Sequence, residues 1–263
     1  FMGYFFILTA PLIVIVPFSA FRSLAGEQED RTYELMSITT LSPRQIVRGK
    51  LGSCVLQMVI YLSAMAPCLA FTYMLRGIDF LTIFYLVLIA FLASLGLAVI
   101  GLFLGTLTAE KHWQIVLSVA WIASLLLALF SGWGIVADLM FWGPFPFRDV
   151  EFWQVNAALL TGYLAYFLLI FYAAAARITF STDNRSTRLR VVMLLQFALA
   201  TAWMAWLWVG PEGRGDEDVL LAFLTMVGIH WYAKGETTNR DSPELSLRVK
   251  RRLPQSFLGR GFL

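Results

Sequence analysis

Apolar residues in this chain fall into long uninterrupted runs, without the spacing of a single helix face or a strand. A membrane-spanning helix needs about 20 such residues, because the hydrocarbon core is about 30 Å thick and a helix rises about 1.5 Å per residue. The pattern predicts about seven spans, of which the seventh is short. Their ranges are Phe1–Phe21, Leu51–Leu75, Phe80–Thr108, Trp113–Ala137, Phe152–Ala176, Val191–Gly210 and Val219–Ala233. The predicted fold class is all-α, a polytopic transmembrane helical bundle.

Positive charges fall on one side of this arrangement. If the loop from Arg22 to Lys50 is cytoplasmic, 17 of the 20 Lys and Arg residues lie on the cytoplasmic side, and only Arg76, Arg148 and Arg214 lie outside. The positive-inside rule predicts this asymmetry. The protein is therefore expected in the cell membrane, with its C-terminus in the cytoplasm.

Composition supports membrane insertion and argues against several functions. The 263 residues are 59% hydrophobic and 14% charged, whereas a soluble domain has about 25% charged residues. The net charge of +3 is too small to indicate nucleic-acid binding. No acidic or basic residue lies in the middle third of any predicted span, which argues against a proton relay or a cation pump. His112 and His230 have no other ligand at suitable spacing, so no metal site is predicted.

The longest polar stretch between spans covers residues 26–50 and reads GEQEDRTYELMSITTLSPRQIVRGK. Its acidic start suits the positive end of a helix dipole. Mixed apolar and polar residues over Thr32–Ile38 predict a short helix at the membrane surface. Ser42 can cap a new helix with Pro43 at its first position. That helix is predicted to continue without a break into the second span.

These residues resemble the first cytoplasmic loop of ABC exporter permeases of the ABC-2 class. Members of that family carry an acidic start, Gly-Thr-x-Glu-Leu, Thr-Pro-Leu-Ser, a basic residue and a Gly-Lys at the next span. The matching residues here are Glu27, Glu29, Thr32, Glu34, Leu35, Thr39, Leu41, Ser42, Arg44, Ile46, Gly49 and Lys50. Arg31 stands where the family usually has Gly, and Thr40 where it usually has Pro. The motif covers about a tenth of the chain.

The resemblance implies a transport subunit that is not itself an enzyme. The loop would dock on a separate ABC ATPase subunit, which would hold ATP and Mg, and a second permease subunit would complete a homo- or heterodimer among membrane lipids. This chain has no GxxxxGK[ST] pattern, since Gly49-Lys50 is followed by Leu51. No cofactor is therefore predicted on this chain.

The resemblance also suggests a domain organisation. Residues 1–233 would form the transmembrane permease domain, with the coupling loop at 22–50 and a re-entrant or interfacial aromatic outer loop at 138–152. Residues 234–263 would form a basic cytoplasmic tail. In the family's six-span plan, the first span would lie upstream of Phe1, and the last two spans here would be additional.

Small and polar residues inside the spans predict helix packing. Gly101 and Gly105 form a GxxxG pattern, which favours close packing inside one subunit over a dimer contact. Polar side chains in or near the spans are expected to form hydrogen bonds between helices, with substrate contact as the lesser alternative. They are Gln57, Gln114, Asn156 and Gln196.

Two other functional classes remain open at the level of sequence. A seven-span receptor-like protein fits the predicted topology, although Lys234 lies at a boundary and not deep in the last span, where a retinal protein needs its lysine. A membrane scaffold without transport activity also fits. For the permease, the charge-free spans favour a large or lipid-like substrate over an ion.

Overall fold

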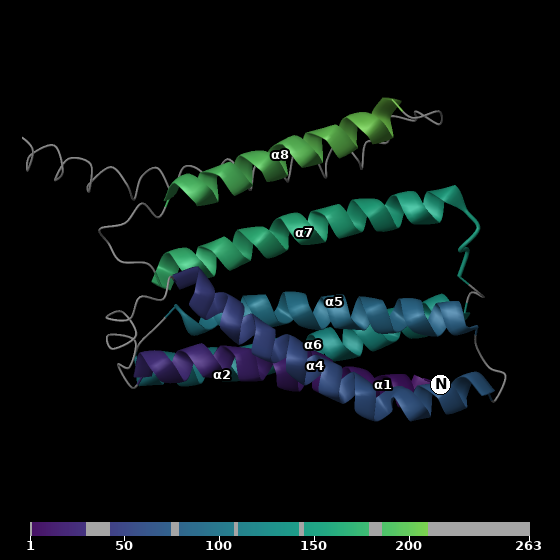
Figure 1. The fold of residues 1–263 in the computed structure, drawn as a ribbon, viewed down its shortest axis with the longest axis horizontal. Helices are drawn as coiled ribbons and strands as arrows, with labels where there is room; N and C mark the ends of the chain where they lie inside the picture. The colour runs from purple at the N-terminus through teal and green to yellow at the C-terminus, as the bar shows by residue number, and fades with distance from the viewer. Residues whose placement is uncertain are drawn as a thin grey trace, which may run out of the picture. The chain divides into compact units, whose positions relative to one another are not determined.

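The computed structural model describes residues 2–29, 43–74, 79–107, 110–141, 145–178 and 186–209. Within these ranges the regular elements are helices and there is no strand, so the all-α class is confirmed for them (Figure 1). The helices are α1 (Met2–Ala10), η1 (Pro11–Ile15), α2 (Val16–Glu29), α4 (Pro43–Met74), α5 (Phe80–Gly105), α6 (Lys111–Phe141), α7 (Val150–Ile178) and α8 (Ser186–Val209).

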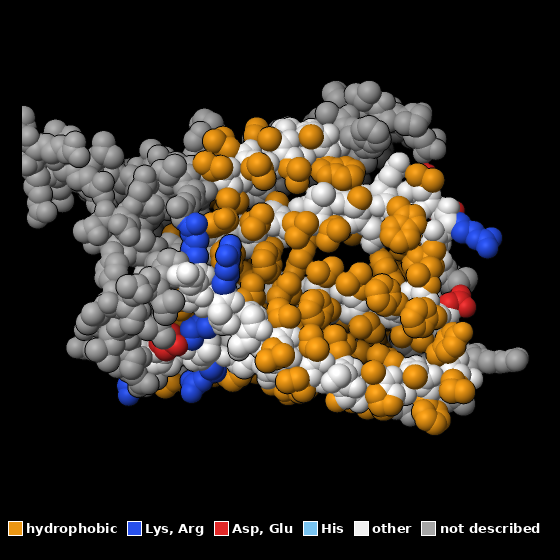
Figure 2. All heavy atoms as spheres, viewed as in Figure 1, with side chains coloured by type: hydrophobic (Ala, Val, Ile, Leu, Met, Phe, Trp, Pro, Cys, Tyr) orange, Lys and Arg blue, Asp and Glu red, His pale blue; other side chains and the backbone are white. Residues whose placement is uncertain are grey.

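Five helical stretches are long and apolar enough to cross a membrane, and they coincide with the first five predicted spans. They are Phe5–Glu27, Arg44–Phe71, Phe80–Gly105, Lys111–Phe141 and Val150–Ile178. These helices indicate a multi-pass membrane protein. Figure 2 agrees, because hydrophobic side chains cover the middle of the visible helices and charged side chains lie toward their ends.

The predicted sixth and seventh spans are not among these five helical stretches. The described apolar part of α8, Val191–Trp203, is shorter than a span. The seventh, Val219–Ala233, and the tail at 234–263 lie outside the described residues. The chain divides into two compact units, Phe1–Arg185 and Ser186–Leu263, so α8 is described by itself. The total of about seven spans stays a prediction.

The first span, formed by α1, η1 and α2, lies at the centre of the first unit. Half of its most apolar window is buried, compared with 11% for α4. The main core joins α2, α4, α5 and α7 through side chains that include Val16, Met58, Leu102 and Phe171. On another side of α2, Trp121 of α6 is buried in a second apolar cluster. This packing explains a tryptophan in the interior of the predicted span Trp113–Ala137.

One π-helical turn, η1, interrupts the first span between two prolines. The Val16 N–H donates to the Pro11 carbonyl, one residue farther back than in an α-helix. In an α-helix the Val16 N–H would donate to the Leu12 carbonyl, so here that carbonyl loses its donor. With π-helical spacing the donor would come from Pro17, which has no N–H. The buried hydroxyl of Ser94 on α5 donates to the Leu12 carbonyl. A side chain from a neighbouring helix therefore satisfies this backbone group.

Two glycines bring the backbones of α2 and α5 together. A Cβ placed on Gly101 would lie 2.6 Å from the Pro17 carbonyl oxygen, and one on Gly105 would lie 2.8 Å from that of Phe21. Cβ atoms do not approach other atoms so closely, so this packing requires glycine at both positions. The GxxxG pattern thus packs inside the chain, the alternative that the sequence favoured over a dimer contact.

The aromatic loop between α6 and α7 is shorter than the predicted range 138–152, because both helices extend into it. After Gly134, no Gly or Pro interrupts the sequence before Gly143, so α6 can continue to Phe141. Phe145 and Phe147 pack on Tyr85 of α5, with ring centroids 5.4 and 5.7 Å away. The indole N–H of Trp153 donates to the Phe147 carbonyl at 2.8 Å. The described part of the loop therefore folds onto the bundle.

Candidate functional site

The structure places the two ends of the predicted coupling loop on long helices. The first span continues past its predicted end at Phe21, and α2 ends at Glu29. Glu27 and Glu29 therefore lie in the last turn of a helix, at the negative end of its dipole, and the predicted location at a positive end is wrong. The sequence missed this because contacts with distant residues accompany the end of α2: Leu24 and Ala25 lie against Gly105 of α5, and Glu27 pairs with Lys50 of α4.

The other end of the loop agrees with its prediction. Helix α4 begins at Pro43 and continues without a break past Pro67 to Met74. The residues between the two helices, 30–42, lie outside the described residues. They include six of the predicted site residues: Thr32, Glu34, Leu35, Thr39, Leu41 and Ser42.

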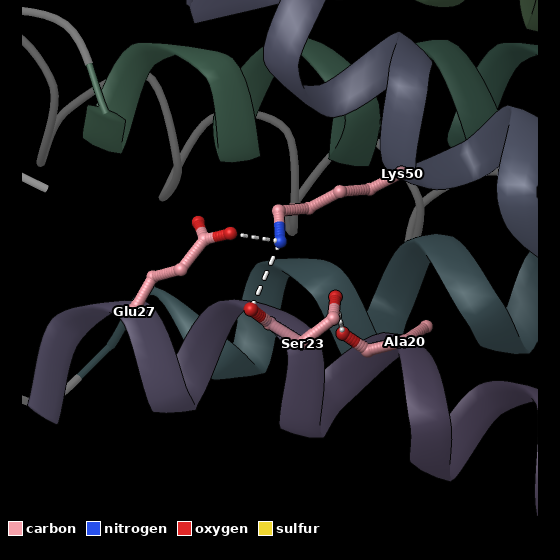
Figure 3. Close-up of polar contacts among 4 residues, drawn as sticks. All are labelled: Ala20, Ser23, Glu27 and Lys50. Carbon is pink, nitrogen blue, oxygen red and sulfur yellow. Dashed lines mark hydrogen bonds and ion pairs between the residues drawn. The ribbon is translucent and has the colours of Figure 1, made fainter. Parts of the chain in front are cut away.

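Lys50 joins the two flanking helices. Its ammonium nitrogen lies 2.6 Å from Glu27 Oε1 and donates to the Ser23 carbonyl oxygen at 2.9 Å (Figure 3). Both charged side chains are mostly buried, with exposed fractions of 15% for Lys50 and 23% for Glu27. The cation stabilises a carboxylate and a carbonyl near the negative end of α2. The structure therefore brings together two predicted site residues from opposite ends of the loop.

The start of α4 is also fixed against α7. Val47 is fully buried in the main core, which includes Ala175 and Ile178 of α7. The Arg44 guanidinium lies 5.8 Å from the centre of the Tyr172 ring, a cation–π geometry. Gly49 is exposed, and a Cβ placed on it would meet no atom within 4 Å. Packing in the described structure therefore does not explain the glycine at this position.

Polar contacts continue between α2 and α4 beyond Lys50. The Ser19 hydroxyl lies 3.1 Å from Gln57 Oε1, and Gln57 Nε2 lies 3.3 Å from the Tyr61 hydroxyl. Gln57 lies seven residues after Lys50, so it is about 10 Å deeper along the helix. The name polar seam is used below for Ser19, Ser23, Glu27, Lys50, Gln57 and Tyr61.

The sequence identified only part of the polar seam. It predicted Gln57 as a contact between helices, which the structure confirms, and it selected Glu27 and Lys50 from a family motif. It missed Ser19 and Ser23. The available signal was the spacing of Ser19, Ser23 and Glu27, which recur every four residues and so share one face of a helix. Ser23 contributes its backbone carbonyl, since its hydroxyl donates to the Ala20 carbonyl.

Other polar residues form contacts away from the polar seam. Gln114 Nε2 of α6 donates to the Ala25 carbonyl at 3.3 Å, and Asn156 Oδ1 accepts from the Tyr85 hydroxyl at 2.5 Å. Both contacts join different helices, as predicted. In the part of the chain that the structure describes, no three His, Cys, Asp or Glu side chains are grouped as metal ligands.

No protein-family model, curated protein or solved structure matches this chain. The multi-pass helical architecture follows from the helices themselves. The resemblance to ABC-2 permeases continues to depend on the loop residues alone.

Proposed function

We propose that this chain is the membrane-spanning permease subunit of an ATP-driven ABC exporter of the ABC-2 class. Two features support the proposal. The residues from Glu27 to Lys50 follow the order of the family's coupling loop, and that region joins two long apolar helices of a multi-pass protein. ATP and Mg would bind to a separate ATPase chain, and a second permease subunit would complete the transporter.

The ion pair between Glu27 and Lys50 is the observation that carries the proposed mechanism. A loop that moves two spans must be attached firmly to both of them. Here α2 ends at Glu29, two residues after Glu27, and α4 begins at Pro43, seven residues before Lys50. The Glu27 and Lys50 side chains connect these two helices at 2.6 Å. A displacement applied to residues 30–42 would therefore move α2 and α4 together.

The packing of α2 would carry this displacement into the bundle. Its contact with α5 is made directly between backbones at Gly101 and Gly105, so α2 cannot slide without moving α5. Arg44 and Val47 attach the start of α4 to α7. A movement at one loop would thus reach four helices.

Purification with partners tests the proposal. The full-length tagged protein is isolated from its own host in mild detergent, and the proteins that co-purify are identified by mass spectrometry. We expect an ATPase with a P-loop, and we expect Glu34→Ala combined with Arg44→Ala to lose it. Arg148→Ala, at the opposite end of the bundle, serves as the matched control. A protein that emerges alone, under conditions that preserve other complexes, contradicts the permease proposal and favours a receptor-like or scaffold role.

A second measurement separates docking from coupling. If the ion pair transmits movement, Lys50→Gln leaves the ATPase bound but lowers transport per ATP hydrolysed in reconstituted vesicles. Loss of ATPase binding in Lys50→Gln would instead show that this lysine belongs to the docking surface. Unchanged coupling in this variant would remove the ion pair from the mechanism.

A further inference from the structure

Helix α4 presents an exposed face that none of the described helices covers. Only 11% of its most apolar window is buried, the lowest share among the five candidate spans. The residues at the loop end of this face lie in two neighbouring rows, in each of which positions recur every four residues, so they share one side of the helix. They are Arg48, Gly49, Gly52, Ser53, Leu56 and Ile60, and all are exposed. They are called the α4 outer face below.

Arg48 gives the α4 outer face a positive charge that no acidic side chain balances among the described residues. Helix α4 contains three cationic residues and no acidic residue. Lys50 is paired with Glu27, and Arg44 lies over the Tyr172 ring. Arg48 is exposed and has no ion-pair or hydrogen-bond partner among the described residues. An anionic group can therefore approach it without displacing a contact made by the described residues.

Ser53 adds a second polar group to this face. Its hydroxyl has no partner in the described part of the chain, whereas the hydroxyl of Ser63 farther along α4 donates to the Ile60 carbonyl at 2.8 Å. Ser53 lies five residues beyond Arg48, or about 7.5 Å along the helix. Between them, a Cβ on Gly49 or Gly52 would meet no atom within 4 Å, so the helix backbone itself is accessible there.

The face becomes apolar beyond Ser53. Leu56 and Ile60 are 63% and 56% exposed and point away from the core. The order along the helix is thus a cation, an accessible backbone with one hydroxyl, and an apolar surface. This order matches the anionic headgroup, the ester region and the acyl chains of a phospholipid.

We propose that the α4 outer face binds an anionic glycerophospholipid. The phosphate contacts the Arg48 guanidinium, an ester carbonyl accepts the hydrogen bond of Ser53, and the acyl chains cover Leu56 and Ile60. A lipid fits better than an acidic protein, because the charge and the exposed apolar surface are continuous on one face of the candidate span Arg44–Phe71. The proposal does not depend on transport or on an ATPase.

Native mass spectrometry of the full-length, delipidated protein tests this inference. The protein is titrated with phosphatidylglycerol and with phosphatidylcholine of identical chains. The wild type is expected to retain the anionic lipid about fivefold more strongly, the effect of one arginine at a membrane surface. Arg48→Gln is expected to abolish that preference. Arg22→Gln removes an exposed arginine from α2, and this variant is expected to keep the preference for phosphatidylglycerol.

A steric variant tests the location independently of charge. Gly52→Leu places a large side chain where the lipid would contact the helix, so it is expected to weaken retention of phosphatidylglycerol with all charges intact. A preference that survives Arg48→Gln contradicts the proposal. An equal loss in Arg22→Gln also overturns it, because the effect would then come from diffuse charge. Arg48-dependent capture of a protein without any lipid preference would assign the face to that protein instead.

Discussion

Helix α2 contacts two neighbours in different ways. Toward α5, its backbone lies directly against Gly101 and Gly105, and these contacts exclude other side chains. Toward α4, it combines the apolar main core with polar side chains that are only partly buried, including Glu27 and Ser19. The first contact is set by shape and tolerates no added atoms, whereas the second depends on polar groups that can exchange partners. The comparison indicates that shape alone fixes α2 against α5, whereas polar side chains contribute to the attachment of α4.

The largest expected effect is on the close contact. Gly101→Leu forces a side chain against the Pro17 carbonyl and should lower the free energy of unfolding by more than about 3 kcal/mol. The measurement is unfolding of the detergent-solubilised protein, followed by circular dichroism. Gly132→Leu is the control, because a Cβ at that position on α6 meets no atom within 4 Å. Equal stability of the two variants would show that α2 and α5 are not tightly paired.

Ser94 should have an intermediate effect. In Ser94→Ala the Leu12 carbonyl loses the only donor that the structure shows for it in the described residues, which should cost about 1–2 kcal/mol. Ser118→Ala is the matched control, because its hydroxyl donates to the Ile115 carbonyl of its own helix. The same unfolding assay compares them. A Ser94 variant as stable as the control would mean that η1 does not need this hydrogen bond.

The ion pair should have the smallest effect on stability. A double-mutant cycle with Glu27→Gln and Lys50→Gln should give a coupling energy of about 1 kcal/mol, since both side chains retain some exposure to solvent. The same cycle on Glu110 and His112, which are 69% and 71% exposed, should give a value near zero. A Glu27–Lys50 coupling energy larger than the loss of stability in Gly101→Leu would reverse the comparison, because α4 would then be the more firmly attached neighbour.

Much of the architecture was predictable from the chain. Long apolar runs located the first five spans, because the length of a spanning helix is fixed by the thickness of the membrane and not by its neighbours. The start of α4 at Pro43 followed from local chemistry, since proline suits the first turn of a helix. The end of α2 at Glu29 did not follow, because the contacts near it, of Ala25 with Gln114 and of Glu27 with Lys50, involve residues far away in the sequence.

The candidate site shows the same division. The motif selected Glu27 and Lys50 separately, from a resemblance to a family. Their pairing required the helices to be placed antiparallel and at a particular rotation, which no local pattern specifies. The polar seam was therefore only partly visible before the structure, as isolated polar residues in apolar runs.

The sequence by itself determined that this protein is helical and membrane-spanning, because backbone groups in lipid must be satisfied within each helix. It also determined where the helices begin when a proline marks the start. Only the tertiary structure decided which faces of these helices meet. Gly101 lies against Pro17, Ser94 completes the π-helical turn, and Lys50 reaches Glu27. Each of these contacts joins residues on different helices, and rotation of one helix by a single position would remove it.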